Sequence, residues 1–433
     1  MMRDLLNITA LGIEELKKLG AEKAKVSAAE TVTHEFNVDG GKFSLFRTLF
    51  SSSVSMSAIK NHKKGVYATN KTDEDAIKQA ALECIAVADS ATPDEAWDLA
   101  PDHEHKTFFD KTTKPDLEKL FERSVELVDY IKNNHPTIII EQMIVTHCEK
   151  NGVYRNTSGA VYEVREGYYG LDLMFSAHEG EECSSFFGVG VTTEDLDKPF
   201  YEMGSIKTDL ERVERQIRTR SVDGKFVGTV LLTPDSFADF IGSIIGNFAS
   251  DRPVLDGTSI WLDKEGEKVA DERLTVAFPV EYEGIVGRDN FTDAGFLCED
   301  YTLIDKGVLT YFPLSLYVAN KTGKKPVKNT LSGLVVVPGE NSLDEIISKI
   351  DRGIMVGRFS GGAPGISGDF SGVAKNSFLI ENGKITDAVS ETMISGNLAE
   401  MLNSLVDISS DTVADGANVM PYAAFSGVTV SGK

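Results

Sequence analysis

Histidine and cysteine are scarce in this sequence of 433 residues, which has seven histidines and four cysteines. The cysteines are widely spaced and form no Cys-x-x-Cys pair, a usage that fits a reducing compartment rather than a disulfide-bonded secreted protein. No histidine follows His178, and no cysteine follows Cys298. The C-terminal part of the chain therefore cannot assemble a zinc site from its own histidines and cysteines.

Long apolar runs are absent as well. The N-terminal segment carries Asp4, Glu14 and Glu15 where a signal peptide needs an unbroken apolar stretch, so we expect a helix there. The longest uncharged run, 416–432, is interrupted by Pro421 and polar residues and cannot form a membrane span. These features predict a soluble, cytoplasmic protein.

Positive charge is in deficit. The sequence has 67 aspartates and glutamates against 44 lysines and arginines, which gives a formal net charge of −23 at pH 7. Such a surface on average repels phosphate backbones and anionic lipids. We therefore expect neither nucleic acid nor a membrane among the direct partners.

The spacing of hydrophobic residues predicts an α+β protein that is divided into three successive segments. Residues 1–192 are expected to form an N-terminal α+β domain with helices and a long antiparallel sheet, because apolar residues at helical spacing alternate with β-branched and aromatic runs. Residues 193–226 are polar and charged and predict a connecting helical segment, with a charged helix over 205–220. Residues 227–433 carry short strands, turn signals and a few helical stretches, which predicts a C-terminal β-rich domain.

Two details of the first part are open to a structural check. Turns are expected at 149–152 and 157–159, which would make 138–191 an antiparallel meander. Residues 92–114, rich in proline, aspartate and histidine, are typical of a surface linker. His103 and His105 lie there without a third ligand, so a solvated loop is favoured over a metal site.

The stretch 353–405 contains three pieces that are each specified locally. A short apolar strand leads into a glycine-rich loop, GRFSGGAPGISGDFSG. Asn382 and Gly383 lie between two apolar runs, a strong hairpin signal because both turn positions tolerate positive φ. After the hairpin, apolar residues from Leu398 onward fit one face of a helix.

The order of a GDFSG-type loop, an IENGKI hairpin and an ISGNL helix start resembles the TldD/PmbA family, long named "modulator of DNA gyrase". The resemblance extends over nearly the whole chain, including the GVYATN passage of the first part. It implies that the C-terminal domain is barrel-like. It also implies a pair of subunits, in which a TldD-like zinc metalloprotease joins a PmbA/TldE-like relative that lacks the metal motif.

One passage indicates which subunit this chain resembles. In the protease subunit a strand leads into a helix with the sequence LLHEAVGH, and the corresponding passage here is LLTPDSFA. Thr233, Pro234 and Ala238 then occupy the positions of the family's histidine, glutamate and histidine. Threonine and alanine offer no imidazole for zinc, and proline has no carboxylate to activate a metal-bound water.

The resemblance therefore implies a non-catalytic PmbA/TldE-type subunit of a metalloprotease that acts on unfolded or flexible peptides. No catalytic residue and no cofactor are expected in this chain, and zinc is expected in a TldD-like partner. A dimer is implied, with a homodimer when the chain is alone.

The glycine-rich loop is the candidate for peptide binding. It lacks the Gly-Lys-Ser/Thr end of a phosphate-binding loop and the Gly-x-Ser-x-Gly of a nucleophile elbow. Its glycines could leave backbone groups free to pair with an extended peptide, although tight turns inside a sheet explain them equally well. The candidate residues are Ser360, Gly361, Gly362, Gly368, Asp369 and Phe370.

Two alternative functions stay open. The run HEGEEC could place His178, Glu179 and Cys183 around a metal in a self-sufficient peptidase, but two strong ligands do not hold zinc and an acidic hairpin tip is the plainer interpretation. The other alternative is a modulator of DNA gyrase that acts through protein contacts, which an acidic surface permits.

Overall fold

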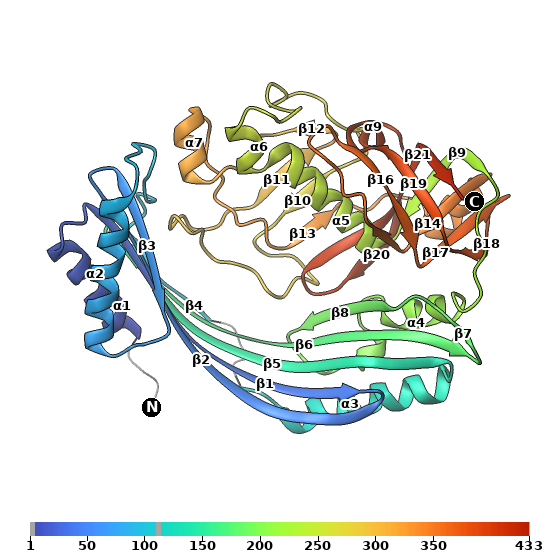
Figure 1. Cartoon of the computed structure of the whole chain (residues 1–433), viewed down its shortest axis with the longest axis horizontal. Coiled ribbons are helices and arrows are strands. Elements are labelled where there is room, and N and C mark those ends of the chain that lie inside the picture. Colours follow the sequence, from blue (N-terminus) through green and yellow to red (C-terminus); the bar gives the residue numbers. More distant parts are fainter. Residues whose placement is uncertain (1–4, 110–113, 433) are drawn as a thin grey trace.

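The computed structural model describes residues 5–109 and 114–432. Within these ranges the chain forms two bodies, each built on one large sheet (Figure 1). The eight strands of the first sheet end at Thr193, and the thirteen strands of the second begin at Lys225. The predicted α+β class is confirmed.

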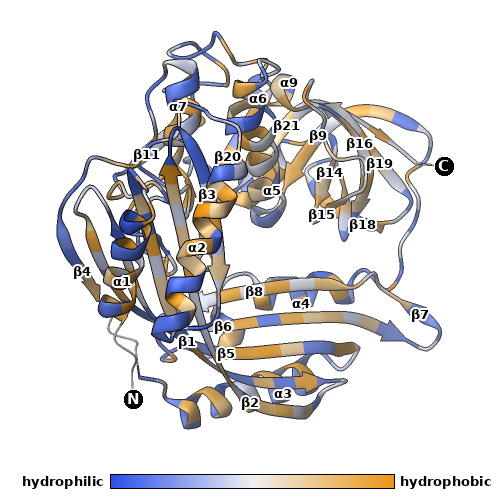
Figure 2. Cartoon of the chain, turned by 60° about the vertical axis from the view of Figure 1, so that its left-hand side comes forward, coloured by the Kyte–Doolittle hydropathy of each residue, from blue (hydrophilic) through white to orange (hydrophobic). Residues whose placement is uncertain are grey.

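Four long antiparallel strands form the centre of the first sheet: β1 (Lys23–Asp39), β2 (Lys42–Lys60), β5 (Ile138–Asn156) and β6 (Val161–Glu179). The strand order is β3-β2-β1-β5-β6-β4, with two further strands on β6. The shorter strands are β3 (Lys63–Thr69), β4 (His105–Phe109), β7 (Glu182–Cys183) and β8 (Phe187–Thr193). Figure 2 shows hydrophobic and hydrophilic residues alternating along β5 and β6, the period expected of strands with one buried face.

Helices pack at both ends of this sheet. α1 (Leu5–Lys18) and α2 (Glu74–Ser90) lie together at one end, where their apolar residues join a core with β1 and β2. α3 (Leu117–Asn134) and α4 (Ile206–Glu214) share a second core with β5, β6 and β8. No helix in the described ranges has both the length and the hydrophobicity needed to cross a bilayer.

The second sheet has the strand order β12-β11-β10-β13-β21-β9-β14-β17-β18. In the pairing of the described residues β12 and β18 are its open ends, so this β-rich part is not a closed barrel. A branch of β15, β16 and β19 joins the sheet through β21, and β20 also pairs with β21. The strands are β9 (Lys225–Leu232), β10 (Val276–Phe278), β11 (Tyr301–Asp305), β12 (Val308–Leu309), β13 (Leu334–Val336), β14 (Arg352–Val356), β15 (Arg358–Ser360), β16 (Asp369–Lys375), β17 (Ser377–Glu381), β18 (Lys384–Val389), β19 (Thr392–Asn397), β20 (Leu405–Ala414) and β21 (Asn418–Ser431).

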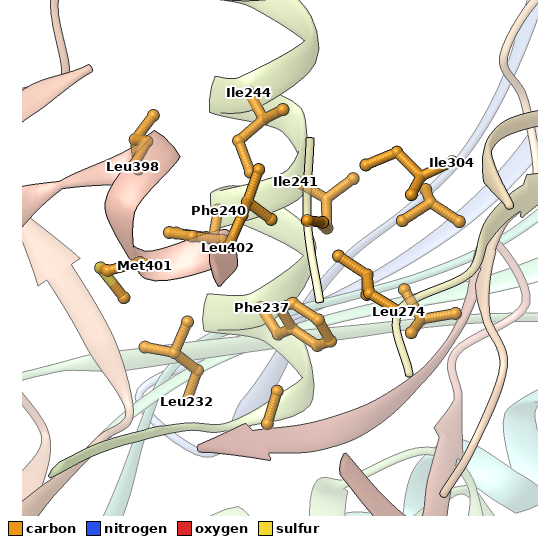
Figure 3. Close-up of a cluster of buried hydrophobic side chains, with 14 of the residues drawn as sticks. Leu232, Phe237, Phe240, Ile241, Ile244, Leu274, Ile304, Leu398, Met401 and Leu402 are labelled. Carbon is orange, nitrogen blue, oxygen red and sulfur yellow. The ribbon is translucent and has the colours of Figure 1, made fainter. Parts of the chain in front are cut away.

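α5 (Pro234–Ile244) is the helix at the centre of the second body, and a π-helical turn over Ile245–Ala249 extends it. Its apolar side chains belong to the largest buried cluster of the chain. Figure 3 shows Leu398 and Met401 of α9 on one side of α5, and Leu274 and Ile304 on the other. The remaining helices are α6 (Asp251–Leu255), α7 (Leu316–Thr322), α8 (Leu343–Ser348) and α9 (Leu398–Asn403).

The two bodies are joined at separate places. Near α7, the Tyr317 ring stacks on Trp97 with centroids 3.8 Å apart, and Tyr317 also donates a hydrogen bond to Asp94. Near α4, Arg212 donates to the Tyr422 hydroxyl of β21 at 2.8 Å. The second body therefore faces the first sheet across several side-chain contacts.

Three local predictions were wrong. The expected turn at 149–152 is instead part of β5, which pairs continuously with β1 and β6 there. An ion pair of 2.9 Å between Lys150 of β5 and Glu166 of β6 lies in the same stretch. The expected linker contains β4, which begins at His105 and runs parallel to β6. The charged helix expected over 205–220 ends at Glu214.

Candidate functional site

The site begins where β9 leads into α5. Thr233 is the N-cap of the helix and has extended backbone angles, and Pro234 occupies the first helical position, where its missing N–H is not needed. The Thr233 hydroxyl donates to the Gly357 carbonyl at 3.4 Å. These two residues therefore connect the strand to the helix, as the sequence predicts.

A cavity of about 670 Å³ opens beside α5, between this helix, the glycine-rich loop and α9. Its size lies within the usual range of small-ligand pockets. Figure 3 shows Leu232, Phe240, Leu398 and Met401, four residues of its wall, around α5 and α9. The lining residues are Val230, Leu232, Ser236, Ala238, Asp239, Phe240, Gly242, Ser243, Val356, Phe359, Gly361, Gly362, Ala363, Pro364, Phe370, Ile394, Leu398, Met401 and Val428.

The cavity brings together two groups of residues that the sequence indicated separately. Ala238, which the sequence predicts at the position of the family's second histidine, lines the same cavity as Gly361, Gly362 and Phe370 of the glycine-rich loop. These residues are more than 120 positions apart in the chain. The helix that carries Ala238 and the candidate peptide-binding loop therefore face one another across this cavity.

The other three peptide-binding candidates have structural contacts and do not line this cavity. Ser360 lies in β15, and its backbone pairs with Val373 of β16. Asp369 accepts hydrogen bonds from Ser367 and Asn397, which lower the pKa of its carboxyl. Gly368 has φ +86° and packs closely on the Phe248 ring.

Several loop glycines are needed for close packing. A Cβ atom on Gly362, where φ is +54°, would lie 1.6 Å from the Ser371 carbonyl oxygen. A Cβ atom on Gly372 would lie 2.4 Å from the Phe359 ring. Close packing against neighbouring groups thus explains these two glycines directly. Among the described strands, β15 pairs on one edge only, with β16.

Polar side chains are few in the cavity and come from α5. Asp239 is the one charged residue among the described lining residues, and Ser236 lies one turn before it on the same helix face. Ser236 is 6% exposed, and its hydroxyl has no hydrogen-bond partner in the described part of the chain. Sequence reasoning missed both residues, although their spacing in the predicted helix could have indicated a shared face.

A smaller cavity of about 140 Å³ adjoins the first and shares Ala238 and Asp239 with it. Asp235 and Asp415 also line it. Burial of the carboxyl in this recess, together with the nearby aspartates, raises the pKa of Asp235 to about 7, although its side chain still reaches solvent. Burial also raises the pKa of Asp239. Three aspartate carboxyl groups therefore gather at this end of α5.

Zinc does not fit the side chains that the sequence predicts at the positions of the family's metal motif. The Thr233 hydroxyl is hydrogen-bonded to the backbone, Pro234 has no donor atom, and Ala238 offers only a methyl group. Across residues 5–109 and 114–432, no group of three histidine, cysteine, aspartate or glutamate side chains is placed to hold a metal ion. The site lacks the donor set that zinc chemistry requires.

The HEGEEC alternative forms a short hairpin. His178 and Cys183 are opposite each other in the β6–β7 pairing, as the sequence predicts. The Glu179 carboxylate, however, is paired with Arg218 at 2.8 Å. The described part of the chain supplies no third metal ligand here, and the arrangement is that of an acidic turn held by an arginine.

Comparison with known proteins places these features in context. A family model described as the PmbA/TldA metallopeptidase C-terminal domain matches residues 224–432. The chain is 24% identical over 415 residues to a metalloprotease of Methanothermobacter thermautotrophicus, covering 90% of this chain and 88% of that protein. It is 23% identical over 424 residues to the metalloprotease PmbA of Escherichia coli O157:H7, covering 93% and 90%.

Solved structures share the fold over the full length. A candidate modulator of DNA gyrase from Bacteroides thetaiotaomicron has a TM-score of 0.88 at 24% identity, with 100% of both chains covered. TldE from Thermococcus kodakarensis has a TM-score of 0.83 at 18% identity, covering 97% of this chain and 99% of that one. In both cases the structural similarity extends over the two bodies of this chain.

Proposed function

We propose, because the chain belongs to the PmbA/TldD family, that it is the PmbA/TldE-type subunit of a two-chain metalloprotease and binds unfolded or flexible peptides without cleaving them. The observation that carries the proposal is the cavity beside α5. It joins Ala238, where the family's protease subunit has a zinc-binding histidine, to the glycine-rich loop. The chain thus keeps a ligand-sized recess at the position of the metal motif without the metal-binding side chains.

The shape of the cavity suits a peptide. Aromatic and aliphatic side chains form most of its wall, which favours burial of one apolar peptide side chain. β15 pairs on one edge only within the described strands, and its other edge could accept an extended peptide by backbone hydrogen bonds. Side-chain burial and strand addition together would hold a segment that has no fold of its own.

The chemistry of cleavage would come from the partner. We place zinc and the water-activating glutamate in a TldD-like chain, with this chain shaping the substrate cavity or stabilising the dimer. The shared fold with TldE of Thermococcus kodakarensis supports this assignment. The cytoplasm is the compartment we propose, since flexible peptides and a reducing environment for four free cysteines both occur there.

Filling the cavity tests the peptide-binding role. We expect Ala238→Trp to weaken binding of a fluorescently labelled, unstructured peptide by about tenfold or more, because the indole would occupy the space of a buried peptide side chain. Fluorescence anisotropy with the full chain measures the affinity. Ala86→Trp, on the exposed face of α2, is the matched control and should bind the peptide normally. Equal binding by wild type and Ala238→Trp would contradict the proposal.

A further inference from the structure

The outer edge of β2 lacks a strand partner over much of its length. Along its inner edge β2 pairs with β1 from Lys42 to Ile59. On the outer edge β3 pairs only with 54–60, so in the described part of the chain 42–53 present unpaired backbone groups to solvent. Figure 1 shows this margin of the first sheet on the side away from the second body. Such a row of free N–H and C=O groups is a template for another strand.

This edge carries few of the features that keep sheets apart. Natural proteins protect an exposed edge with charged residues or proline. From 42 to 53 the strand contains no proline, and Lys42 and Arg47 are its two charged residues. The Arg47 guanidinium is already paired with the Glu35 carboxylate of β1 at 3.0 Å. Little charge is therefore left to repel a second strand.

Large apolar side chains are exposed along the same segment. Phe46 is 57% exposed, although its ring stacks on Phe36 of β1 with centroids 4.7 Å apart, and Phe50 is 78% exposed. On α3, the Phe121 ring contacts that of Phe43 and continues the apolar surface. We call this surface the β2 edge patch, and its members are Phe43, Leu45, Phe46, Leu49, Phe50 and Phe121.

The area of the β2 edge patch is that of a protein interface. A phenylalanine can bury about 150–250 Å², so the exposed fractions of the four rings and two leucines amount to about 600 Å² of apolar surface per chain. Two such patches facing each other would bury about 1,200 Å² before any backbone is counted, above the roughly 1,000 Å² expected of a specific interface.

The sequence of the edge favours a second copy of this chain as the occupant. Residues directly opposite each other in an antiparallel pair have their side chains on the same face. In a pairing centred on Thr48, Phe46 of each copy lies opposite Phe50 of the other. Arg47 then lies opposite Leu49, whereas a pairing centred on Arg47 would place two arginines opposite each other. The first register forms two aromatic pairs and opposes no like charges.

We propose that two copies of this chain associate through the β2 edge patch and join their first sheets into one antiparallel sheet centred on Thr48. The same residues of both copies form this interface, so each aromatic pair occurs twice by symmetry. An unrelated extended segment could use the same backbone groups but would not supply the matching rings. The inference concerns assembly of the chain with itself, and it does not depend on the proposed peptide binding.

Sedimentation of the full chain at micromolar concentrations tests the association. We expect wild type to sediment with twice the mass of one chain. Phe50→Glu should raise the dimer dissociation constant by about hundredfold or more, because each interface loses two buried rings and gains two charges. Phe109→Glu is the matched control and should dimerise like wild type, since Phe109 is 65% exposed on β4, outside the patch and at the other end of the strand order.

Disulfide trapping tests the register, in a background where the exposed Cys183 is replaced by serine. In Thr48→Cys the two introduced thiols would face each other across the symmetry axis, close enough for a disulfide, so we expect a covalent dimer on mild oxidation. Ser51→Cys is the control, because Ser51 would lie opposite Leu45 of the other copy, and it should give little covalent dimer. Thermal unfolding verifies that every variant is folded.

The contrary outcomes are distinct from each other. A monomeric wild-type chain, or a Phe50→Glu chain that dimerises as tightly as wild type, would overturn the inference and leave the peptide-binding role standing. A covalent dimer from Ser51→Cys but not from Thr48→Cys would overturn the register. A Phe50→Glu effect confined to association with a TldD-like chain would overturn the second copy as the occupant. Dimerisation without any peptide binding would support this inference and overturn the proposed function.

Discussion

Asp235 is a residue whose ionisation is costly in the folded chain. Its ordinary pKa of 3.8 rises to about 7, first because protein atoms of the recess displace part of the water around its carboxyl, and then because Asp209, Asp415 and Asp239 are nearby. The side chain is nevertheless exposed. The unfolded chain releases this proton near the ordinary value, so the folded state binds more protons between about pH 4 and pH 7. This residue therefore makes the fold less stable as the pH rises through that window.

Replacing Asp235 by asparagine should remove this pH dependence. We expect Asp235→Asn to unfold at a higher temperature than wild type at pH 8, and the difference to vanish near pH 4, where the aspartate is protonated in both states. Thermal unfolding followed by circular dichroism at several pH values measures it. Asp344→Asn is the matched control, since Asp344 occupies the same second position of α8 but lies outside the acidic recess. A constant offset at all pH values would contradict the prediction.

At the residue scale, the family motif directed attention to three residues that the structure places close together. Sequence reasoning predicts that Thr233, Pro234 and Ala238 replace metal-binding and catalytic side chains, and all three lie at the β9–α5 junction or in the cavities beside it. It missed Ser236 and Asp239, because a single serine or aspartate in a helix carries no signal until the opposite wall of the cavity is known.

The glycine-rich loop can adopt its conformation only because glycine, which has no side chain, occupies certain positions. We expect Gly362→Ala to destabilise the chain by about 3 kcal/mol, since the added methyl would clash with the Ser371 carbonyl at an already left-handed backbone position. Gly365→Ala is the matched control in the same loop, where a Cβ atom meets no neighbour within 4 Å. We expect it to change stability by about 1 kcal/mol or less.

Chemical denaturation of both glycine variants measures the difference. A Gly362→Ala chain as stable as Gly365→Ala would show that the loop can move away from Ser371, and the packing explanation of the glycine would then fail. The comparison uses unfolding alone, because Gly362 also lines the cavity and a binding change would not separate the two effects.

Local signals predicted elements well when their neighbours did not interfere. The Asn382-Gly383 hairpin forms as expected between β17 and β18, with both turn residues at positive φ. The expected turn at 149–152 failed because β5 has a partner on each side there, and two continuous ladders outweigh the turn preference of Asn151 and Gly152.

The arrangement of the whole molecule could not be predicted from the sequence. Contacts such as the stack of Trp97 on Tyr317 join residues more than 200 positions apart and follow no local pattern. The open ends of the second sheet likewise follow from long-range pairing. The α+β class could be predicted because it depends on the periodicity of each segment, whereas the cavity depends on how those segments meet.

Zinc content and proteolysis, measured together on this chain alone and after mixing with a TldD-like partner, test the central claim most directly. The substrate is an unstructured peptide, and metal is quantified in each purified sample. We expect cleavage and stoichiometric zinc only when the partner is present, because Thr233, Pro234 and Ala238 offer no zinc ligands and residues 5–109 and 114–432 hold no other group of metal-binding side chains. Stoichiometric zinc and peptide turnover by this chain alone would contradict the account and redirect attention to His178 and Cys183.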